Sequence, residues 1–170
     1  MKLLSFEKTD ATVCLYIEAL RKKIENNAIL QSKALNSNPE SKALLADISQ
    51  NDNLERMDQV IELAVFECYS MFADMLKSKA CGVKRKTGSD ENAYYCISLR
   101  LPIGYPESSL EAIAVQAQEY VICRALNDWC MIIAMPDIAA EWNSRCERCR
   151  GEISRMMSVR TKPIHHSHEA

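Results

Sequence analysis

Glycine and proline are scarce in this sequence, with only four and five residues respectively in a chain of 170. An all-β protein of this length needs many tight turns, and such turns are built largely from these two residue types. Aromatic residues make up 6% of the chain, and the formal net charge is −2. A charge so close to zero provides no molecule-wide field that would favour nucleic acid or an anionic membrane. The composition therefore favours a mainly helical protein.

Long uncharged apolar runs are also lacking. Residues 1–8 do not contain the apolar stretch of a signal peptide, and no uncharged segment is long enough to cross a membrane. We therefore expect no membrane partner and a cytosolic, reducing environment. In that environment the cysteines would remain reduced and serve mainly as small apolar residues on helix faces. There are eight of them, at positions 14, 68, 81, 96, 123, 130, 146 and 149.

Residues 108–159 predict the central element of the fold, two helices joined at Met135-Pro136. Ser108 and Glu111 have the spacing of a capping box, and proline at 136 ends one helix while suiting the first turn of the next. The first helix carries two apolar stripes, which is typical of a helix covered on both flanks. The second carries a single seam, as in an antiparallel hairpin. The seam consists of Ile138, Trp142, Cys146, Cys149, Ile153 and Met156.

The remaining segments predict further helices and a strand. A helix capped by Thr9 or Asp10 should run to about residue 34, followed by a loop over residues 36–41 and a short helix over 42–48. A second capping box at residues 52–55 should start an amphipathic helix ending near residue 80. Alternation over residues 95–101 marks a half-buried strand. Its partner would be residues 2–7 or the same strand of another subunit.

These elements together predict a mainly α fold, a bundle of about four helices with a small two-stranded β element. Residues 1–163 are expected to form a single helical domain, and residues 164–170 a disordered tail containing basic and histidine residues.

Cys146 and Cys149 form the most tempting chemical motif. With His165, His166 and His168 downstream, they offer two thiolates and two imidazoles, a donor set that suits zinc, and they could otherwise act as a redox pair. Both cysteines, however, fall inside a helix on its apolar seam, where a thiolate is not stabilised. We therefore expect buried structural cysteines, no metal and no cofactor.

Two groups of basic residues are candidate interaction sites. Lys84, Arg85 and Lys86, close to Lys77 and Lys79, form one group, while Arg155, Arg160 and Lys162 form a basic C-terminal region. No aromatic residue is interleaved between positions 77 and 86, and no nucleic-acid recognition module is evident. Solvated basic segments are the simpler interpretation. Sequence-independent contact with DNA or a partner remains the alternative.

Tryptophan and acidic residues of the helical pair have plain structural interpretations. Trp129 and Trp142 lie on apolar stripes and are expected in the core, with interface anchoring as the alternative. Glu119, Asp128 and Glu141 have no histidine, serine or metal ligand placed to make them catalytic, so surface positions are expected.

Residues 119–129, with the run Arg124-Ala125-Leu126 and then Trp129, are followed by a helix that starts at Pro136 and by the basic end 160–163. This pattern resembles a group of small proteins encoded among the structural genes of tailed phages and prophages. The resemblance covers roughly residues 50–163, and the many cysteines and the histidine-rich end depart from it. It implies a non-enzymatic head–tail connector, an adaptor or head-completion protein that forms a ring between portal and tail.

That resemblance also implies the partners and the location. They would be further copies of the chain in the ring, other virion proteins, and DNA held through phosphate contacts, with the protein located in the virion and in the host bacterial cytoplasm. Two alternatives from other classes remain open. One is a stand-alone helical interaction or regulatory module that forms a dimer, and the other is a protein that binds zinc through cysteine and histidine.

Overall fold

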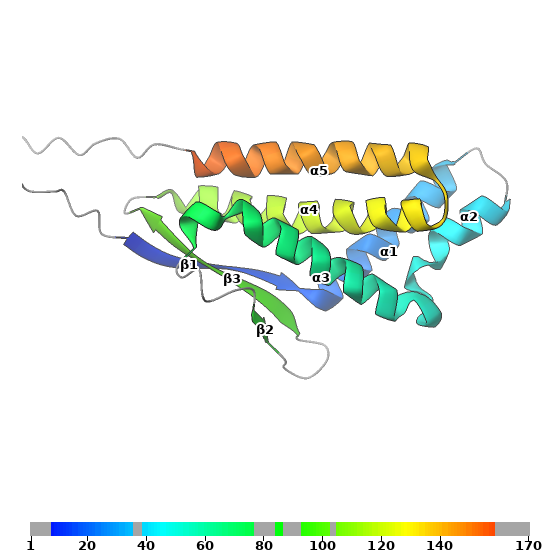
Figure 1. Cartoon of the computed structure of the whole chain (residues 1–170), viewed down its shortest axis with the longest axis horizontal. Coiled ribbons are helices and arrows are strands. Elements are labelled where there is room, and N and C mark those ends of the chain that lie inside the picture. The colour runs from blue at the N-terminus through cyan, green and yellow to red at the C-terminus, as the bar shows by residue number, and fades with distance from the viewer. Residues whose placement is uncertain (1–7, 36–38, 77–83, 87–92, 103–104, 159–170) are drawn as a thin grey trace, which may run out of the picture.

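The computed structural model describes residues 8–35, 39–76, 84–86, 93–102 and 105–158, which form a set of helices beside a small antiparallel sheet (Figure 1). Short 3₁₀ turns at Asp47–Ser49, Asn51–Asn53 and Ala73–Met75 flank the third helix. The prediction of a mainly helical fold with a small β element is confirmed. The elements follow in the order β1 (Lys8–Tyr16), α1 (Ile17–Ala34), α2 (Pro39–Ala46), α3 (Leu54–Met71), β2 (Lys84–Lys86), β3 (Tyr94–Pro102), α4 (Glu107–Ile132) and α5 (Pro136–Met157).

Helix α4 lies at the centre, with α5 running antiparallel along it and α3 and α1 packed on its other sides (Figure 1). The two-sided apolar pattern predicted for this segment is confirmed over most of its length, since Ala117, Val121, Ile122 and Leu126 are buried. Val115 and Ile132, which the same stripes include, are exceptions because both are exposed. The small side chains of α4 allow the neighbouring helices to approach closely.

The seam of α5 faces α4 as the sequence predicts. Its residues from Ile138 to Ile153 are buried, and Met156 is half-buried. Pro136 occupies the first turn, where its missing N–H costs no hydrogen bond, and Asp137 lies at the positive end of the helix dipole. Gly151 lies on the exposed side with no atom near the position of an added Cβ.

The turn between α4 and α5 is closed by backbone hydrogen bonds. The N–H of Met135 donates to the carbonyl of Cys130 at 2.8 Å, and the N–H of Ala134 donates to that of Met131 at 3.3 Å. This is the Schellman arrangement, in which the residue after the C-cap is left-handed, and Ala134 has φ 56°. The helix therefore ends at Ile132, slightly earlier than the expected boundary at Met135. A glycine would normally signal such an end, and none is present.

The sheet has the strand order β1-β3-β2, with all pairs antiparallel. Val13 and Leu15 of β1 and Ile97 and Leu99 of β3 are buried and belong to the main hydrophobic core. The strand expected over residues 95–101 is confirmed, but its main partner is β1, which belongs to the same chain. The expectation that residues 2–7 or another subunit would pair with it is therefore wrong for this edge, and residues 2–7 themselves lie outside the described part.

The predicted start of the first helix at Thr9 or Asp10 is wrong, because residues 8–16 form β1 and the helix begins at Ile17. The interval from Val13 to Ile17 fits both a helical period and the alternation of a strand, so it could not discriminate between them. Burial of Val13, Leu15 and Ile17 follows a period of two. Beyond that point the prediction holds, since Leu20 and Ile24 are buried in α1.

Both predicted capping boxes are also wrong. Helix α4 begins at Glu107 with Pro106 as its N-cap, and neither α4 nor α3 has a side-chain cap hydrogen bond. The Asn53 side chain instead donates to the carbonyl oxygen of Asp47 at 2.8 Å, which fastens the preceding 3₁₀ turn. Other boundaries shift as well, because α2 begins at Pro39 within the expected loop and α3 ends at Met71.

Candidate functional site

The predicted metal or redox motif lies in the core. Cys146 and Cys149 are buried between α5 and α4, where both contact the thiol of Cys123 on α4. A hydrogen bond with the Cys146 thiol, together with burial, raises the pKa of Cys123 to about 12. A hydrogen bond with Cys123, reinforced by burial, also raises the pKa of Cys149. The raised pKa values keep the thiols of Cys123 and Cys149 protonated, and protonated thiols are poor nucleophiles and poor metal ligands.

Two more buried thiols follow the same logic. Burial raises the pKa of Cys68 on α3 to about 12 and that of Cys130 on α4 to about 11. Within the described ranges, no group of three or more cysteine, histidine or acidic residues is arranged to hold a metal ion. His165 and His166, the other members of the predicted donor set, lie outside those ranges, as does His168.

The predicted basic interaction residues are only partly described. Lys84, Arg85 and Lys86, interpreted from the sequence as a solvated basic segment, form β2 and pair with β3. Arg155 is exposed near the end of α5, where its guanidinium forms an ion pair with Glu152. Arg160 and Lys162, like Lys77 and Lys79, lie outside the described residues.

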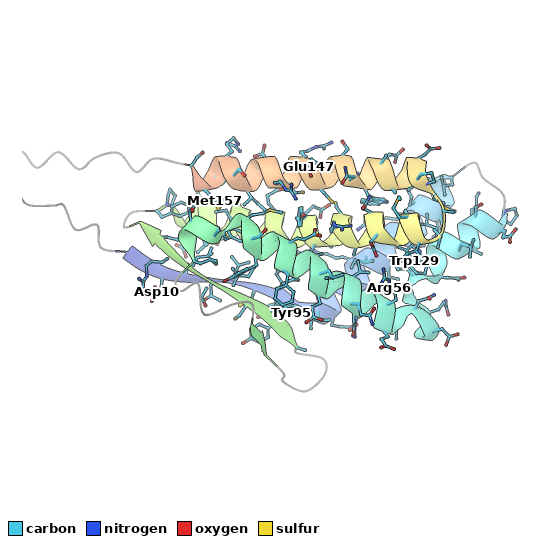
Figure 2. The ribbon with its side chains drawn as sticks, in the orientation of Figure 1. Asp10, Arg56, Tyr95, Trp129, Glu147 and Met157 are labelled. Carbon is cyan, nitrogen blue, oxygen red and sulfur yellow. The ribbon has the colours of Figure 1, made fainter. Side chains whose placement is uncertain are left out.

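Trp129 and Trp142 are both buried, as the sequence predicts. Trp129 lies with Arg56 where α4 meets α3 (Figure 2), and both line a small hollow there. The Arg145 guanidinium stacks over the Trp142 ring, 4.4 Å from the ring centroid. Such cation–π contacts stabilise by roughly 0.5–1 kcal/mol at exposed sites.

The three acidic residues near the hairpin are at or near the surface. Glu119 and Glu141 are exposed, and Asp128 is half-buried and accepts a hydrogen bond from Arg56 of α3 at 3.0 Å. The Glu119 carboxylate lies 3.8 Å from the Cys123 sulfur, which is a weak contact. The Cys123 thiol beside Glu119 stays protonated at neutral pH because its pKa is raised to about 12, so it is a poor nucleophile.

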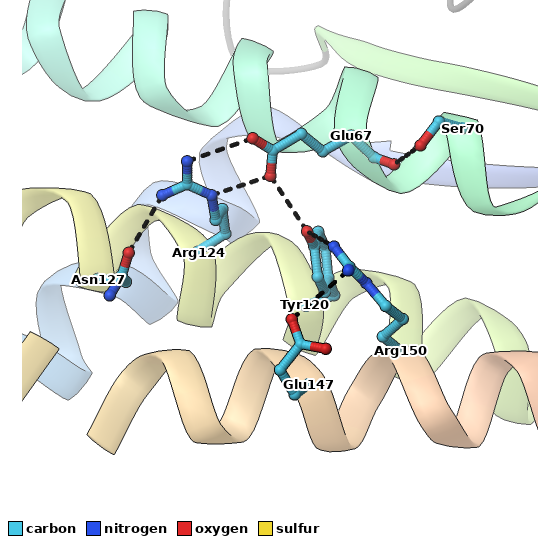
Figure 3. Close-up of polar contacts among 7 residues, drawn as sticks. All are labelled: Glu67, Ser70, Tyr120, Arg124, Asn127, Glu147 and Arg150. Atoms are coloured by element: carbon cyan, nitrogen blue, oxygen red, sulfur yellow. Dashed lines mark hydrogen bonds and ion pairs between the residues drawn. The ribbon is translucent and has the colours of Figure 1, made fainter. Parts of the chain in front are cut away.

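A polar network joins α3, α4 and α5 at the middle of the bundle (Figure 3). The Arg124 guanidinium donates to both carboxylate oxygens of Glu67, at 2.9 and 3.2 Å, and the Tyr120 hydroxyl donates to the same carboxylate at 3.1 Å. Arg150 of α5 in turn donates to the Tyr120 hydroxyl at 3.3 Å and pairs with Glu147. These contacts fix the relative positions of the three helices.

The network also sets the charge states of its members. Burial acts to raise the pKa of Glu67, but the hydrogen bonds and charge of Arg124 outweigh it, so this pKa is lowered overall. Burial raises the pKa of Tyr120 to about 12, so the phenol stays protonated at neutral pH. At neutral pH the network therefore combines the charged Glu67 carboxylate with the Arg124 guanidinium and a protonated Tyr120 phenol, and it acts as a structural clamp between the helices.

Sequence patterns did not single out this network, although one signal was present. Arg124 lies in a helix that is apolar on two sides, and a charge in such a place needs an oppositely charged partner. The sequence does not say which acidic residue provides it. Glu67 lies 57 positions away on another helix.

A surface hollow of about 140 Å³ lies beside α3. Sites for small molecules usually measure roughly 300–1,000 Å³ and combine apolar walls with convergent polar groups. This hollow is smaller and contains neither a histidine nor a cysteine. It is lined by Ile17, Glu55, Asp58, Gln59, Ile61, Glu62 and Tyr95.

Exposed apolar side chains mark two separate surfaces. The first, here called the α3 surface, consists of Leu63 and Phe66, which are 59% and 48% exposed on the side of α3 away from the core. The name hairpin-end surface is given to four exposed apolar residues that lie on α1, α2 and the end of α4. These segments lie at the end of the molecule where α4 turns into α5 (Figure 1). Its residues are Leu30, Leu44, Met131 and Ile132.

The described helices contain no segment long and apolar enough to cross a membrane. Exposed apolar side chains often mark contacts between proteins, so the two apolar surfaces are candidates for such contacts. Comparisons of the chain with protein-family models, with curated proteins and with solved structures find no match.

Proposed function

We propose that this chain is a non-enzymatic structural protein of the tailed-phage kind, a head–tail connector whose copies assemble into a ring between portal and tail. The observation that carries the proposal is the pair of distinct apolar surfaces, one on α3 and one at the hairpin end. A ring of identical subunits needs a head-to-tail contact, in which one surface of each copy binds a different surface of the next. Two separate patches on one subunit fit that requirement.

The rigidity of the bundle supports the same proposal. A subunit that transmits geometry between two larger assemblies must hold its helices in fixed positions, and the Glu67 network joins three of them. Buried thiols with raised pKa values fit a packing role, since they fill the α4–α5 seam without offering a reactive group.

Contact with DNA would be secondary and sequence-independent in this proposal. Helix α5 carries four arginines and four acidic residues, so the helix as a whole is electrically balanced. Phosphate contacts would then rely on the basic residues after α5, Arg160 and Lys162, together with the exposed Arg155.

Assembly tests the proposal through its two surfaces. Wild-type protein, Phe66→Ser on the α3 surface and Met131→Ser on the hairpin-end surface would be compared by sedimentation velocity over a range of concentrations. We expect wild type to form closed oligomers and each variant to be monomeric. A mixture of the two variants should stop at dimers, because only one intact contact can form between them.

Val115→Ser is the matched control, since Val115 is exposed on α4 but belongs to neither surface. It should assemble like wild type. A symmetric dimer that both substitutions weaken would instead favour the stand-alone interaction module. Portal, capsid and tail genes beside the gene for this chain would support the phage assignment, and their absence would count against it.

A further inference from the structure

Two cysteines outside the buried seam face each other across the sheet. Cys14 of β1 and Cys96 of β3 are direct partners in the antiparallel register, and their sulfur atoms are 3.9 Å apart. Both side chains are half-exposed, whereas the other five cysteines within the described residues are buried. We propose that Cys14 and Cys96 form a reversible disulfide by exchange with a small-molecule disulfide such as oxidised glutathione.

The backbone geometry at this pair favours the bond. The N–H of Ile17 donates to the carbonyl of Ala93 at 3.0 Å, which makes that pair a hydrogen-bonded one. Hydrogen-bonded and non-hydrogen-bonded pairs alternate along an antiparallel ladder, so Cys14 and Cys96, three steps along, form a non-hydrogen-bonded pair. Cα atoms in such pairs lie about 4.5 Å apart, which is within the range that disulfides span.

The other pairs on the same face leave the thiols approachable. Toward one end of the strands Thr12 pairs with Ser98 and Asp10 with Arg100, and at the other end the rings of Tyr16 and Tyr94 are tilted against each other with centroids 5.3 Å apart. The face is therefore polar and only partly covered, unlike the opposite face, where Val13 and Ile97 enter the core. Closing the bond requires the sulfurs to approach by rotation of the side chains, without rearrangement of the core.

The chemistry balances with glutathione disulfide as the oxidant. One cysteine thiolate attacks a sulfur of glutathione disulfide, breaking its S–S bond and releasing one glutathione thiolate. The second cysteine thiolate then attacks the mixed disulfide at the protein sulfur and releases the second glutathione. The two cysteines together lose two electrons and their two protons, and the oxidant becomes two glutathione molecules. The new bond joins strands whose cysteines are 82 positions apart.

The test uses the full-length protein, fully reduced and then equilibrated without oxygen in buffers of defined glutathione-to-disulfide ratio. After acid quenching, non-reducing digestion and mass spectrometry should identify a peptide pair linked through Cys14 and Cys96. The thiol count of the unfolded chain should fall from eight to six, and dithiothreitol should restore it. The disulfide between Cys14 and Cys96 should form roughly tenfold faster than a disulfide between any other two cysteines, because the buried thiols are shielded from glutathione disulfide.

Cys14→Ser and Cys96→Ser should each abolish the loss of two thiols. Cys81→Ser should still lose two thiols. This variant is the control that tests whether Cys81, which lies outside the described residues, takes part in the disulfide. The proposal is overturned if the linked peptide is absent from wild type even in glutathione disulfide alone. It is equally overturned if Cys14→Ser still loses two thiols, or if a different pair forms first.

Discussion

Replacing Glu67 by glutamine should reveal how much the three-helix clamp contributes to stability. The change removes the negative charge that binds the Arg124 guanidinium in a bidentate contact. It also weakens the hydrogen bond that the Tyr120 hydroxyl donates to residue 67. A hydrogen bond to a charged group contributes about 1.5–3 kcal/mol when shielded from water. Here the side chains of Glu67 and Arg124 are 41% and 32% exposed, so solvent reduces the ion pair to about 1 kcal/mol.

The buried Tyr120 hydroxyl adds to this cost. It retains its contact with Arg150 but loses a charged acceptor, which is worth about another 0.5–1 kcal/mol. We therefore expect Glu67→Gln to lower the free energy of unfolding by about 1.5–2 kcal/mol at pH 7. Urea denaturation followed by circular dichroism measures this difference directly.

The effect should depend on pH in a defined direction. The pKa of Glu67 in the folded protein is below its ordinary value of 4.5, so the stabilisation is complete above that value. It is lost as the pH falls through the folded pKa, because the carboxyl group is then protonated in both states. The difference in the free energy of unfolding between wild type and Glu67→Gln should therefore become smaller at acidic pH.

Glu62→Gln is the matched control, since Glu62 is exposed on the same helix. It should change stability by less than about 0.5 kcal/mol. The reasoning is refuted if the two variants lose the same stability at pH 7, or if the loss in Glu67→Gln stays constant from pH 7 to pH 3.

Three further substitutions or measurements address other parts of the fold. Gly151→Ala should raise the free energy of unfolding by about 0.5–1 kcal/mol in urea titrations, because the position is helical and the added methyl meets no atom; a loss would mean that this face is covered. Ala134→Gly should raise it by about 0.5–1 kcal/mol in the same assay, since relief of left-handed strain exceeds the entropy cost of glycine, and a decrease would contradict the strained turn. At pH 8 an alkylating reagent should modify Cys68 in the native protein roughly a thousandfold more slowly than an ordinary thiol, because burial raises the pKa of Cys68 from 9.0 to about 12. Quantitative mass spectrometry measures the two rates, and equal rates would contradict the prediction.

The helical pair was predictable because its signals are local and redundant. The α5 seam repeats over many turns, so Trp142, Cys146 and Cys149 could be placed on one buried face without knowledge of their partners. Proline at 136 fixed the start of α5 for steric reasons that hold in any context. Burial of the seam cysteines also followed from their position on it.

Features that depend on distant partners were not predictable in the same way. Residues 8–16 became a strand because β3 offers them a ladder of backbone hydrogen bonds, whereas their apolar spacing fits a helix equally well. The ends of α3 and α4 also differ from expectation, because tertiary contacts outweigh the modest energy of a side-chain cap. The partner of Arg124 required the packing of α3 against α4 to be known.

The pairing of β1 with β3 has a consequence for how the polypeptide matures on the ribosome. Residues 8–16 emerge early but acquire their partner only after Pro102 has been synthesised. The apolar faces of α1 and α3 likewise stay uncovered until α4, the helix that packs against them, has been synthesised. Nascent chains stalled before residue 132 should therefore expose hydrophobic surface and bind chaperones, whereas chains that have released α5 should not.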